Sequence, residues 1–200
     1  MRFARLLVPF ALVALSLAQS PSPWQGEGPY PRARTGGNYM QNYYLPPAAT
    51  TPWRPAFSPD GQEIAFSMAG SLWAVRIGET EARELTAGAT YDSSPAFSPD
   101  GKRIVYTADE GYRAINLRML DMATGESHEL TRGEFVNLDP VFAPDGKRIL
   151  YVSTEPDGWY SLYEMPLDEA GNPGAPRRLT EEHAYANDRL YFGRQDLHIQ

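Results

Sequence analysis

Short runs of alternating apolar and polar residues fill the chain from residue 53 to residue 180. In the first part of this region Ile64, Phe66 and Met68 alternate with other residues, and so do Trp73, Val75 and Ile77. A period of two over four to eight residues is typical of a half-buried β-strand. The pattern predicts short antiparallel strands over 56–58, 64–68, 73–77 and 82–86.

The same pattern returns twice further along the chain. The segments FSPDGQEIAF, FSPDGKRIVY and FAPDGKRILY start at residues 57, 97 and 142. Other residues keep the same phase, namely Pro55, Pro95 and Pro140 before each segment, Leu72, Leu117 and Leu162 in each third strand, and the Leu-Thr pairs that begin at Leu85, Leu130 and Leu179. The repeat is therefore about 45 residues long, which is the length of a four-stranded β-propeller blade.

Each repeat contains a Pro-Asp-Gly turn between its first two strands. Proline presets φ for the first turn position, aspartate bonds nearby backbone, and glycine adopts the left-handed conformation. A ring of catalytic or calcium-binding acids is the alternative interpretation, but a turn that recurs in every blade needs no chemistry. We interpret all nine residues as structural: Pro59, Asp60, Gly61, Pro99, Asp100, Gly101, Pro144, Asp145 and Gly146.

The repeats predict an all-β fold, a partial β-propeller of about three four-stranded antiparallel blades. The expected divisions are a signal peptide (1–18), an extended N-terminal arm or linker (19–52), blade 1 (53–94), blade 2 (95–139), blade 3 (140–180) and a connector to a further blade (181–200). In the first two repeats a proline follows the threonine of the Leu-Thr pair by nine residues, but none follows Thr180 in this way. We therefore expect the 200 residues to be a truncated propeller.

The first 18 residues have the pattern of an export signal. Arg2 and Arg5 precede an apolar stretch of about 12 residues, too short for the roughly 20 that span a bilayer, and Ser16-Leu17-Ala18 suits a signal peptidase. The chain has no cysteine, which excludes a lipoprotein anchor and disulfides. We expect a periplasmic or secreted bacterial protein with no membrane span after cleavage.

The charge of the chain argues against a nucleic-acid partner. The formal net charge is −7, and removal of Arg2 and Arg5 leaves 16 basic and 25 acidic residues. An acidic surface repels the phosphate backbone.

The repeat pattern P-x-F-S-P-D-G-K-x-I with its closing Leu-Thr resembles the TolB-like, WD-like propeller repeat of exported bacterial proteins. The segments NYMQNYYLPPAATTPW (38–53), GSLWAV (70–75) and DRLYFGRQDLH (188–198) are similar to the N-terminal propeller region of exported amidohydrolase-family proteins. This second resemblance implies a hydrolase domain, with a divalent metal, further along the protein. No such domain is present in this sequence.

The segment itself offers no recognisable catalytic or metal-binding motif. Amidohydrolase metal sites begin with two histidines one residue apart, whereas His128, His183 and His198 are far apart. There is no G-x-S-x-G elbow and no phosphate-binding glycine loop. We therefore predict no catalytic residue, metal ligand or cofactor in this segment.

Aromatic residues are the remaining candidates for binding. Trp159 and Tyr160 follow an inserted Pro156-Asp157-Gly158 turn, and rigid aromatic side chains suit contact surfaces. Core packing is the alternative for the aromatic residues of the strands. We predict a contact surface at Trp159 and Tyr160.

Two functions follow from these observations. The first is a binding or substrate-positioning module of a larger metal-dependent amidohydrolase, with the missing C-terminal blades and the hydrolase domain as partners. The alternative is a non-catalytic periplasmic scaffold of TolB type that binds an envelope protein or a peptide.

Overall fold

A computed structural model describes residues 51–111 and 113–180 of the chain. The predicted signal peptide, most of the predicted arm, the connector, His183 and His198 lie outside the described residues. The part that is described forms three four-stranded antiparallel sheets and contains no helix, which confirms the all-β class and the partial propeller. Consequently, no membrane-spanning helix occurs within those two ranges.

Each repeat forms one blade. Blade 1 contains β1 (Trp53–Phe57), β2 (Glu63–Met68), β3 (Ser71–Arg76) and β4 (Arg83–Glu84). Blade 2 contains β5 (Tyr91–Phe97), β6 (Arg103–Asp109), β7 (Ile115–Asp121) and β8 (Ser127–Glu129). Blade 3 contains β9 (Asn137–Phe142), β10 (Arg148–Ser153), β11 (Ser161–Pro166) and β12 (Arg177–Arg178).

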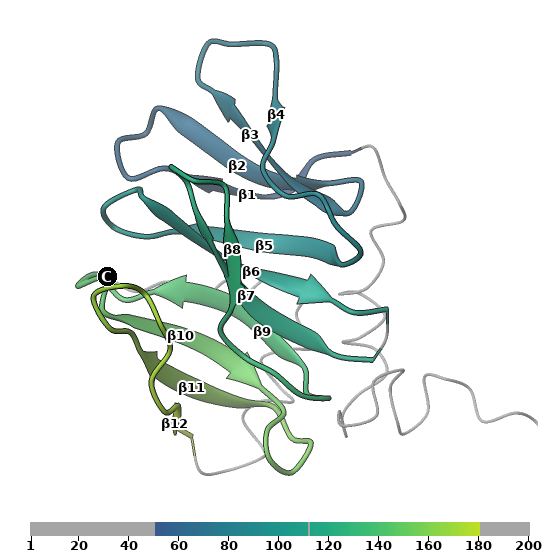
Figure 1. Ribbon diagram of the computed structural model, residues 1–200, viewed down its shortest axis with the longest axis vertical. Coiled ribbons are helices and arrows are strands. Elements are labelled where there is room, and N and C mark those ends of the chain that lie inside the picture. Colours follow the sequence, from purple (N-terminus) through teal and green to yellow (C-terminus); the bar gives the residue numbers. More distant parts are fainter. Residues whose placement is uncertain (1–50, 112, 181–200) are drawn as a thin grey trace, which may run out of the picture.

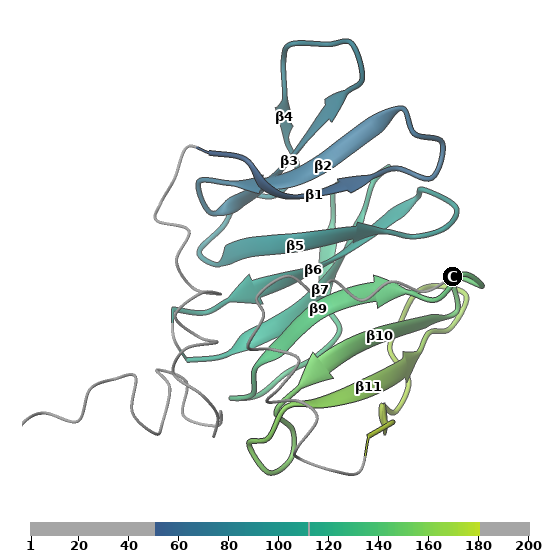
Figure 2. The ribbon, with the colours of Figure 1, turned by 180° about the vertical axis from the view of Figure 1, so that it is seen from behind.

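The blades are stacked as successive layers, with blade 1 and blade 3 at the two ends (Figure 1). Within each sheet the strands follow chain order. The first strands β1, β5 and β9 lie next to one another, as the view from behind shows (Figure 2). These are the inner strands of the propeller, and the short strands β4, β8 and β12 form its outer edge.

The first strand of blade 1 differs from its prediction. We expected it to begin after Pro55, but β1 starts at Trp53 and contains the proline. The register with β2 shifts between Trp53 and Ala56, so Pro55 lies at a β-bulge. A proline has no N–H to donate, and a bulge on an edge strand is one of the few strand positions that accept it.

The Pro-Asp-Gly turns of neighbouring blades touch each other. The glycines Gly61, Gly101 and Gly146 have φ of 67°, 70° and 68°. A Cβ on Gly101 would lie 3.5 Å from Pro59 Cδ, and a Cβ on Gly146 would lie 3.6 Å from Pro99 Cδ. Each proline of one turn therefore packs against the glycine of the next.

The aspartates of the first two turns hold the local backbone. The Ser98 hydroxyl donates to Asp100 Oδ1 at 2.6 Å, and the Lys102 amide donates to the same oxygen at 3.1 Å. The Ser98 hydrogen bond is the main cause that lowers the pKa of Asp100. Asp60 has the same arrangement with Ser58 and Gln62.

The Leu-Thr pairs close each blade by a repeated hydrogen bond. The backbone amides of Leu72, Leu117 and Leu162 donate to the hydroxyl oxygens of Thr86, Thr131 and Thr180 at 3.0, 2.8 and 3.0 Å. The amides of the neighbouring leucines Leu85, Leu130 and Leu179 donate to the carbonyls of the same three residues. The fourth strand is thus fixed to the third although it is only two or three residues long.

Thr131→Val should lower the free energy of unfolding by about 1–2 kcal/mol. Valine has the shape of threonine but leaves the amide of Leu117, a fully buried residue, without its acceptor. Urea denaturation followed by circular dichroism measures the effect. Thr131→Ser keeps the hydroxyl and is the control; an equal loss in both variants would contradict this role for the hydrogen bond.

The core lies between the blades in two separate clusters. Between blades 1 and 2, Ala65 and Leu72 pack with residues of blade 2, namely Ile104, Tyr106, Ala108 and Leu120. Between blades 2 and 3, the blade 2 side consists of Val105, Leu117, Met119 and Leu130, and the blade 3 side of Phe142, Ile149, Tyr151, Tyr163 and Met165. Every blade therefore has one face for the blade before it and another for the blade after it.

Candidate functional site at the inner strands

The inner strands share an unusual backbone feature. In each of them the residue before the proline has a positive φ, with values of 52° for Arg54, 53° for Ser94 and 47° for Asp139. The strand register shifts at the same place in all three sheets. A left-handed conformation costs a non-glycine residue about 1–2 kcal/mol, so the bulge is imposed by the surrounding sheet.

These three bulges meet on the inner side of the propeller. Arg54 Nη1 lies 3.4 Å from Asp139 Oδ1, so an ion pair joins blade 1 to blade 3 across blade 2. The Arg54 side chain is 23% exposed and that of Asp139 is 9% exposed. Ser94, which blade 2 supplies at the equivalent position, is buried.

Two aromatic rings border this charge pair. The ring centroids of Trp53 and Tyr91 are 6.5 Å apart, and the rings are tilted by 44°. The guanidinium carbon of Arg54 lies 5.9 Å from the centroid of the Trp53 ring, within cation–π range. Trp53 and Tyr91 are both partly exposed. A charged pair and an aromatic pair therefore occupy the same stretch of the inner strands.

Asp92 is a buried acid beside this stretch. It follows Tyr91 in β5 and is 4% exposed. Burial raises the pKa of Asp92, and hydrogen bonds from the Thr86 and Thr90 hydroxyls offset part of that rise. The Thr90 hydroxyl donates to Asp92 Oδ1 at 2.8 Å.

Asp92→Asn should stabilise the fold relative to the wild type by an amount that grows with pH. Because the folded-state pKa lies above the ordinary value of 3.8, the stability that Asp92 contributes is fully present at low pH. It is lost as the pH rises through the folded-state pKa. The difference in unfolding free energy between variant and wild type should therefore rise with pH and then level off.

Urea denaturation at a series of pH values measures this difference. Asp60→Asn is the control, because hydrogen bonds from Ser58 and Gln62 lower the pKa of Asp60. The stability from a lowered pKa is lost as the pH falls, so the control should lose stability relative to wild type as the pH rises. If the difference in unfolding free energy between Asp92→Asn and wild type does not change with pH, or falls as the pH rises, burial does not raise the pKa of Asp92.

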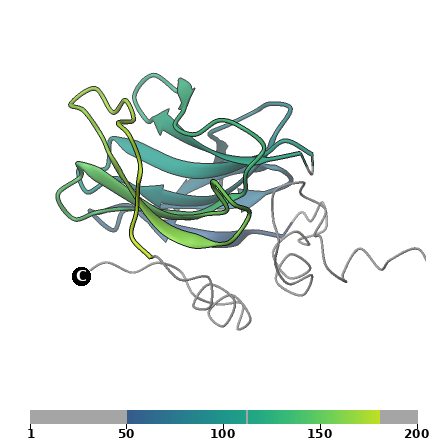
Figure 3. The same ribbon diagram turned by 90° about the horizontal axis from the view of Figure 1, so that it is seen from below.

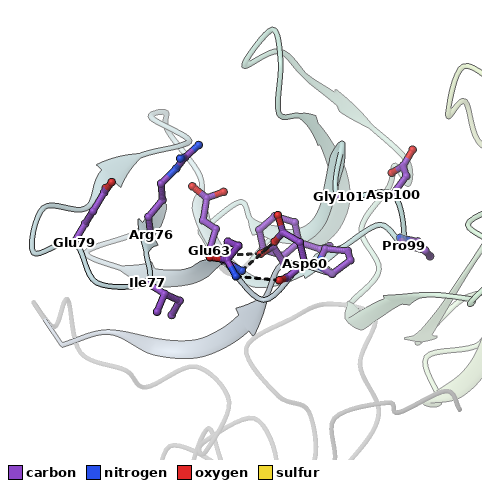
Figure 4. Close-up of a pocket in the computed structure, with 12 residues that line it drawn as sticks. Asp60, Glu63, Arg76, Ile77, Glu79, Pro99, Asp100 and Gly101 are labelled. Carbon is purple, nitrogen blue, oxygen red and sulfur yellow. Dashed lines mark hydrogen bonds between the residues drawn. The ribbon is translucent and has the colours of Figure 1, made fainter.

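A hollow of about 750 Å³ lies between the turns of blades 1 and 2. Asp60 and Glu63 face it from blade 1, and Pro99, Asp100 and Gly101 border it from the next turn (Figure 4). Asp60 and Asp100 already accept hydrogen bonds within the turns, and Glu63 accepts one from Arg83. We therefore interpret this hollow as a result of how the two turns pack, and not as a binding site.

The predicted contact residues Trp159 and Tyr160 lie just before β11. Tyr160 is fully buried and Trp159 is partly exposed. By the repeat, Tyr160 corresponds to Ile115, which is 2% exposed and begins β7. Tyr160 therefore occupies a core position of the blade, and a contact role for Trp159 and Tyr160 stays a prediction.

Among the described residues, none forms a group of three or more His, Asp or Glu side chains that could hold a metal ion. His128 lies in β8, and its Nε2 is 3.3 Å from the Gly171 carbonyl oxygen.

Comparison with known proteins gives no match in sequence. No protein-family model and no curated protein matches the chain. Among solved structures, TolB from Acinetobacter baumannii matches with a TM-score of 0.55 and 21% identity, over 66% of this chain and 33% of that one. A putative TolB from Agrobacterium tumefaciens matches with a TM-score of 0.57 and 24% identity, over 67% of this chain and 48% of that one.

The fold is a TolB-like β-propeller. A Mycobacterium tuberculosis puromycin-hydrolysing peptidase also matches, with a TM-score of 0.54 and 21% identity, over 68% of this chain and 24% of that one. The chain thus spans less than half the length of these TolB-like and peptidase structures. The resemblance to amidohydrolase propellers remains a prediction.

Proposed function

We propose that this TolB-like propeller segment is a protein-interaction scaffold that binds an extended segment of a partner protein at its inner strands. The site consists of Trp53, Arg54, Tyr91 and Asp139. The supporting observation is that the three repeats keep the backbone of the bulge but vary its side chain.

The bulge positions carry a cation, a hydroxyl and an anion in blades that are otherwise alike, namely Arg54, Ser94 and Asp139. The fold requires the bulge and the following proline, but the change of residue type from blade to blade is not required by the strand geometry. Side chains that differ between repeats of one fold and lie together in space are candidates for recognition.

The residue types also suit a protein ligand. Tryptophan, tyrosine and arginine contribute most of the binding energy in protein interfaces. Here Trp53 lies against both Tyr91 and Arg54, and Asp139 pairs with Arg54 and adds an opposite charge. A partner segment with polar or charged groups beside an apolar side chain would complement this surface.

Selection from a displayed peptide library on the purified chain tests the proposal. Selected peptides should lose about tenfold or more in affinity for Arg54→Gln, because an arginine at the centre of an interface typically contributes more than 1.4 kcal/mol. Arg132→Gln, at a side chain that is 84% exposed on blade 2, should bind them unchanged. Enriched peptides that bind Arg54→Gln as tightly as the wild type, or the lack of any enriched peptide, would contradict it.

A second proposal is that the scaffold positions substrate for a hydrolase domain of a longer protein, as the amidohydrolase resemblance implies. The observation in its favour is that this chain matches 24% of a peptidase that hydrolyses puromycin. Any divalent metal would belong to that domain. The coding sequence beyond residue 200 tests this proposal, because an H-x-H strand pair would support it and its absence would contradict the amidohydrolase assignment.

For either role we propose a location in the periplasm or outside the cell, on the basis of the leader pattern of residues 1–18. The intact mass of the chain recovered from a bacterial envelope fraction tests this location. Retention of the first 18 residues would contradict cleavage.

A further inference from the structure

The inner-strand site contains more groups that donate hydrogen bonds than groups that accept them. The Arg54 guanidinium and the Trp53 indole have N–H donors and no acceptor, and the Tyr91 side chain adds a hydroxyl. Trp53 and Arg54 belong to β1, and Tyr91 belongs to β5. Asp139 of β9 supplies the carboxylate that pairs with Arg54. Three side chains that can donate are thus grouped with one carboxylate.

The stacking of the blades brings these residues together. β5 contacts both β1 and β9, so the first strands of the three blades form one continuous series. In the view from below, blade 3 lies in front of blade 2 and blade 1 (Figure 3). The grouping therefore depends only on contacts between blades that the structure describes.

The guanidinium is the more accessible member of the charge pair. The Arg54 side chain is 23% exposed, and that of Asp139 is 9% exposed. Their closest atoms, Arg54 Nη1 and Asp139 Oδ1, are 3.4 Å apart. This contact is longer than the roughly 2.7–2.9 Å of a charge-assisted hydrogen bond. A molecule that approaches the inner strands therefore meets the cation before the anion.

The Tyr91 hydroxyl is oriented as a donor. The Trp53 indole N–H is buried and makes no hydrogen bond of ordinary geometry to any described residue, but it lies beside this hydroxyl. Burial raises the pKa of Tyr91, and the neighbouring N–H offsets part of that rise. Because the indole can only donate, the Tyr91 oxygen accepts in this contact and its own proton is directed elsewhere. Tyr91 therefore adds an O–H donor to the site.

The neighbouring acids lie further from the inner edge or are buried. Asp109 pairs with Tyr91 across β5 and β6, so it is one strand further out than the first strands. Asp92 is 4% exposed and accepts a hydrogen bond from the Thr90 hydroxyl. The first strands therefore present a cation and donors to a ligand.

We propose that the group recognised in the partner segment is a carboxylate, which binds Arg54 in competition with Asp139 and accepts a hydrogen bond from Tyr91. The inference rests on the proposed scaffold function and names the chemistry of its partner. A carboxylate fits the planar guanidinium through two parallel N–H···O bonds. An aspartate or glutamate side chain and a free C-terminus both present this group. An apolar side chain beside it would contact the Trp53 ring.

The peptides enriched in the display selection are the probes for this inference. Each carboxylate of a peptide is removed in turn, by Asp→Asn or Glu→Gln replacement or by amidation of the C-terminus. Removal of one of them should lower the affinity for the wild-type chain by about tenfold or more. Fluorescence anisotropy measures the affinity. The amidated and the side-chain variants distinguish the two sources of the carboxylate.

A double-mutant cycle tests whether this carboxylate binds Arg54. The same replacement should change the affinity for Arg54→Gln much less than for the wild type, because the guanidinium that it pairs with is gone. Arg54→Lys keeps the charge but loses the planar donor geometry, so it should recover only part of the affinity.

Asp139→Asn should raise the affinity by about threefold or more, because the competing carboxylate is removed. Asparagine tolerates the left-handed conformation of this residue, whose φ is 47°. The control Asp145→Asn removes the same charge from an exposed turn of the same blade and should leave the affinity unchanged. Thermal melts check that both variants are folded.

The possible results separate this inference from the scaffold function. Peptides that require Arg54 but keep their affinity after every carboxylate replacement would overturn the carboxylate and leave the scaffold function standing. A lower affinity for folded Asp139→Asn would also overturn it, because a cation would then pair with Asp139. The lack of any enriched peptide would overturn both proposals. The peptide replacements need no protein variant, so they decide the inference even if Asp139→Asn does not fold.

Discussion

Phe142→Ala should lower the free energy of unfolding by about 3–5 kcal/mol, whereas Phe57→Ala should lower it by about 0.5 kcal/mol or less. The two phenylalanines occupy the same position in blades 3 and 1, each at the end of an inner strand. Phe142 is 8% exposed in the core between blades 2 and 3, and Phe57 is 65% exposed. Loss of a buried ring removes apolar burial and leaves a cavity, but loss of an exposed ring does neither.

Urea denaturation at a concentration where light scattering shows a monomer measures both values. The comparison is internally controlled, since residue type, strand position and substitution are the same. Similar losses for the two variants would contradict the assignment of the blade faces.

Gly101→Val should destabilise the fold by about 2–4 kcal/mol, and Gly61→Val by about 1–2 kcal/mol. Both glycines have a left-handed backbone, with φ of 70° and 67°, in which a β-branched residue is strained. At Gly101 the new Cβ would also touch Pro59 at 3.5 Å, whereas nothing lies within 4 Å of a Cβ at Gly61. The valine side chain therefore meets a neighbouring turn at Gly101 and open space at Gly61.

Thermal and urea denaturation of both variants measure the difference. Gly101→Asn is a useful third variant, because asparagine tolerates the left-handed region better than valine. Equal destabilisation by the two valine variants would show that the turns of blades 1 and 2 are not in contact.

The blades could be predicted from the sequence because their turn and strand residues repeat. The Pro-Asp-Gly turn and the Leu-Thr pair each have a local mechanism, a left-handed glycine in one case and a hydroxyl that accepts an amide in the other. Both mechanisms act inside one repeat, since even the Thr131 hydroxyl accepts from the Leu117 amide only 14 residues earlier. The sequence of one repeat is therefore enough to predict the strands of its own blade.

The covered faces of the strands could not be predicted in the same way. Val105 and Tyr106 are adjacent in β6 and both buried, because blade 2 has a neighbour on each side. Apolar residues on both faces of a strand do not indicate which neighbouring blade covers which face. Phe57 is 65% exposed and its counterpart Phe142 is 8% exposed, although both end the first strand of their repeat.

The candidate site was missed for a related reason. Pro55, Pro95 and Pro140 indicate the phase of the repeat, but the residues before them differ in type and share no pattern that indicates a common site. Arg54 and Asp139 are 85 positions apart, and only the stacking of the inner strands brings them together. The sequence feature that points to this site is the residue before the recurring proline, because its charge differs from blade to blade.

The convergence of the inner strands is the central claim, and cross-linking of residues 54 and 139 tests it most directly. The chain has no cysteine, so Arg54→Cys with Asp139→Cys introduces one defined pair. A short bifunctional thiol reagent should link this pair within a monomer under native conditions, and urea should abolish the link. The control pair, Arg54→Cys with Thr124→Cys in the outer loop of blade 2, should stay unlinked. Failure of the first pair to link, or equal linking of both pairs, would contradict the shared inner surface of the three blades.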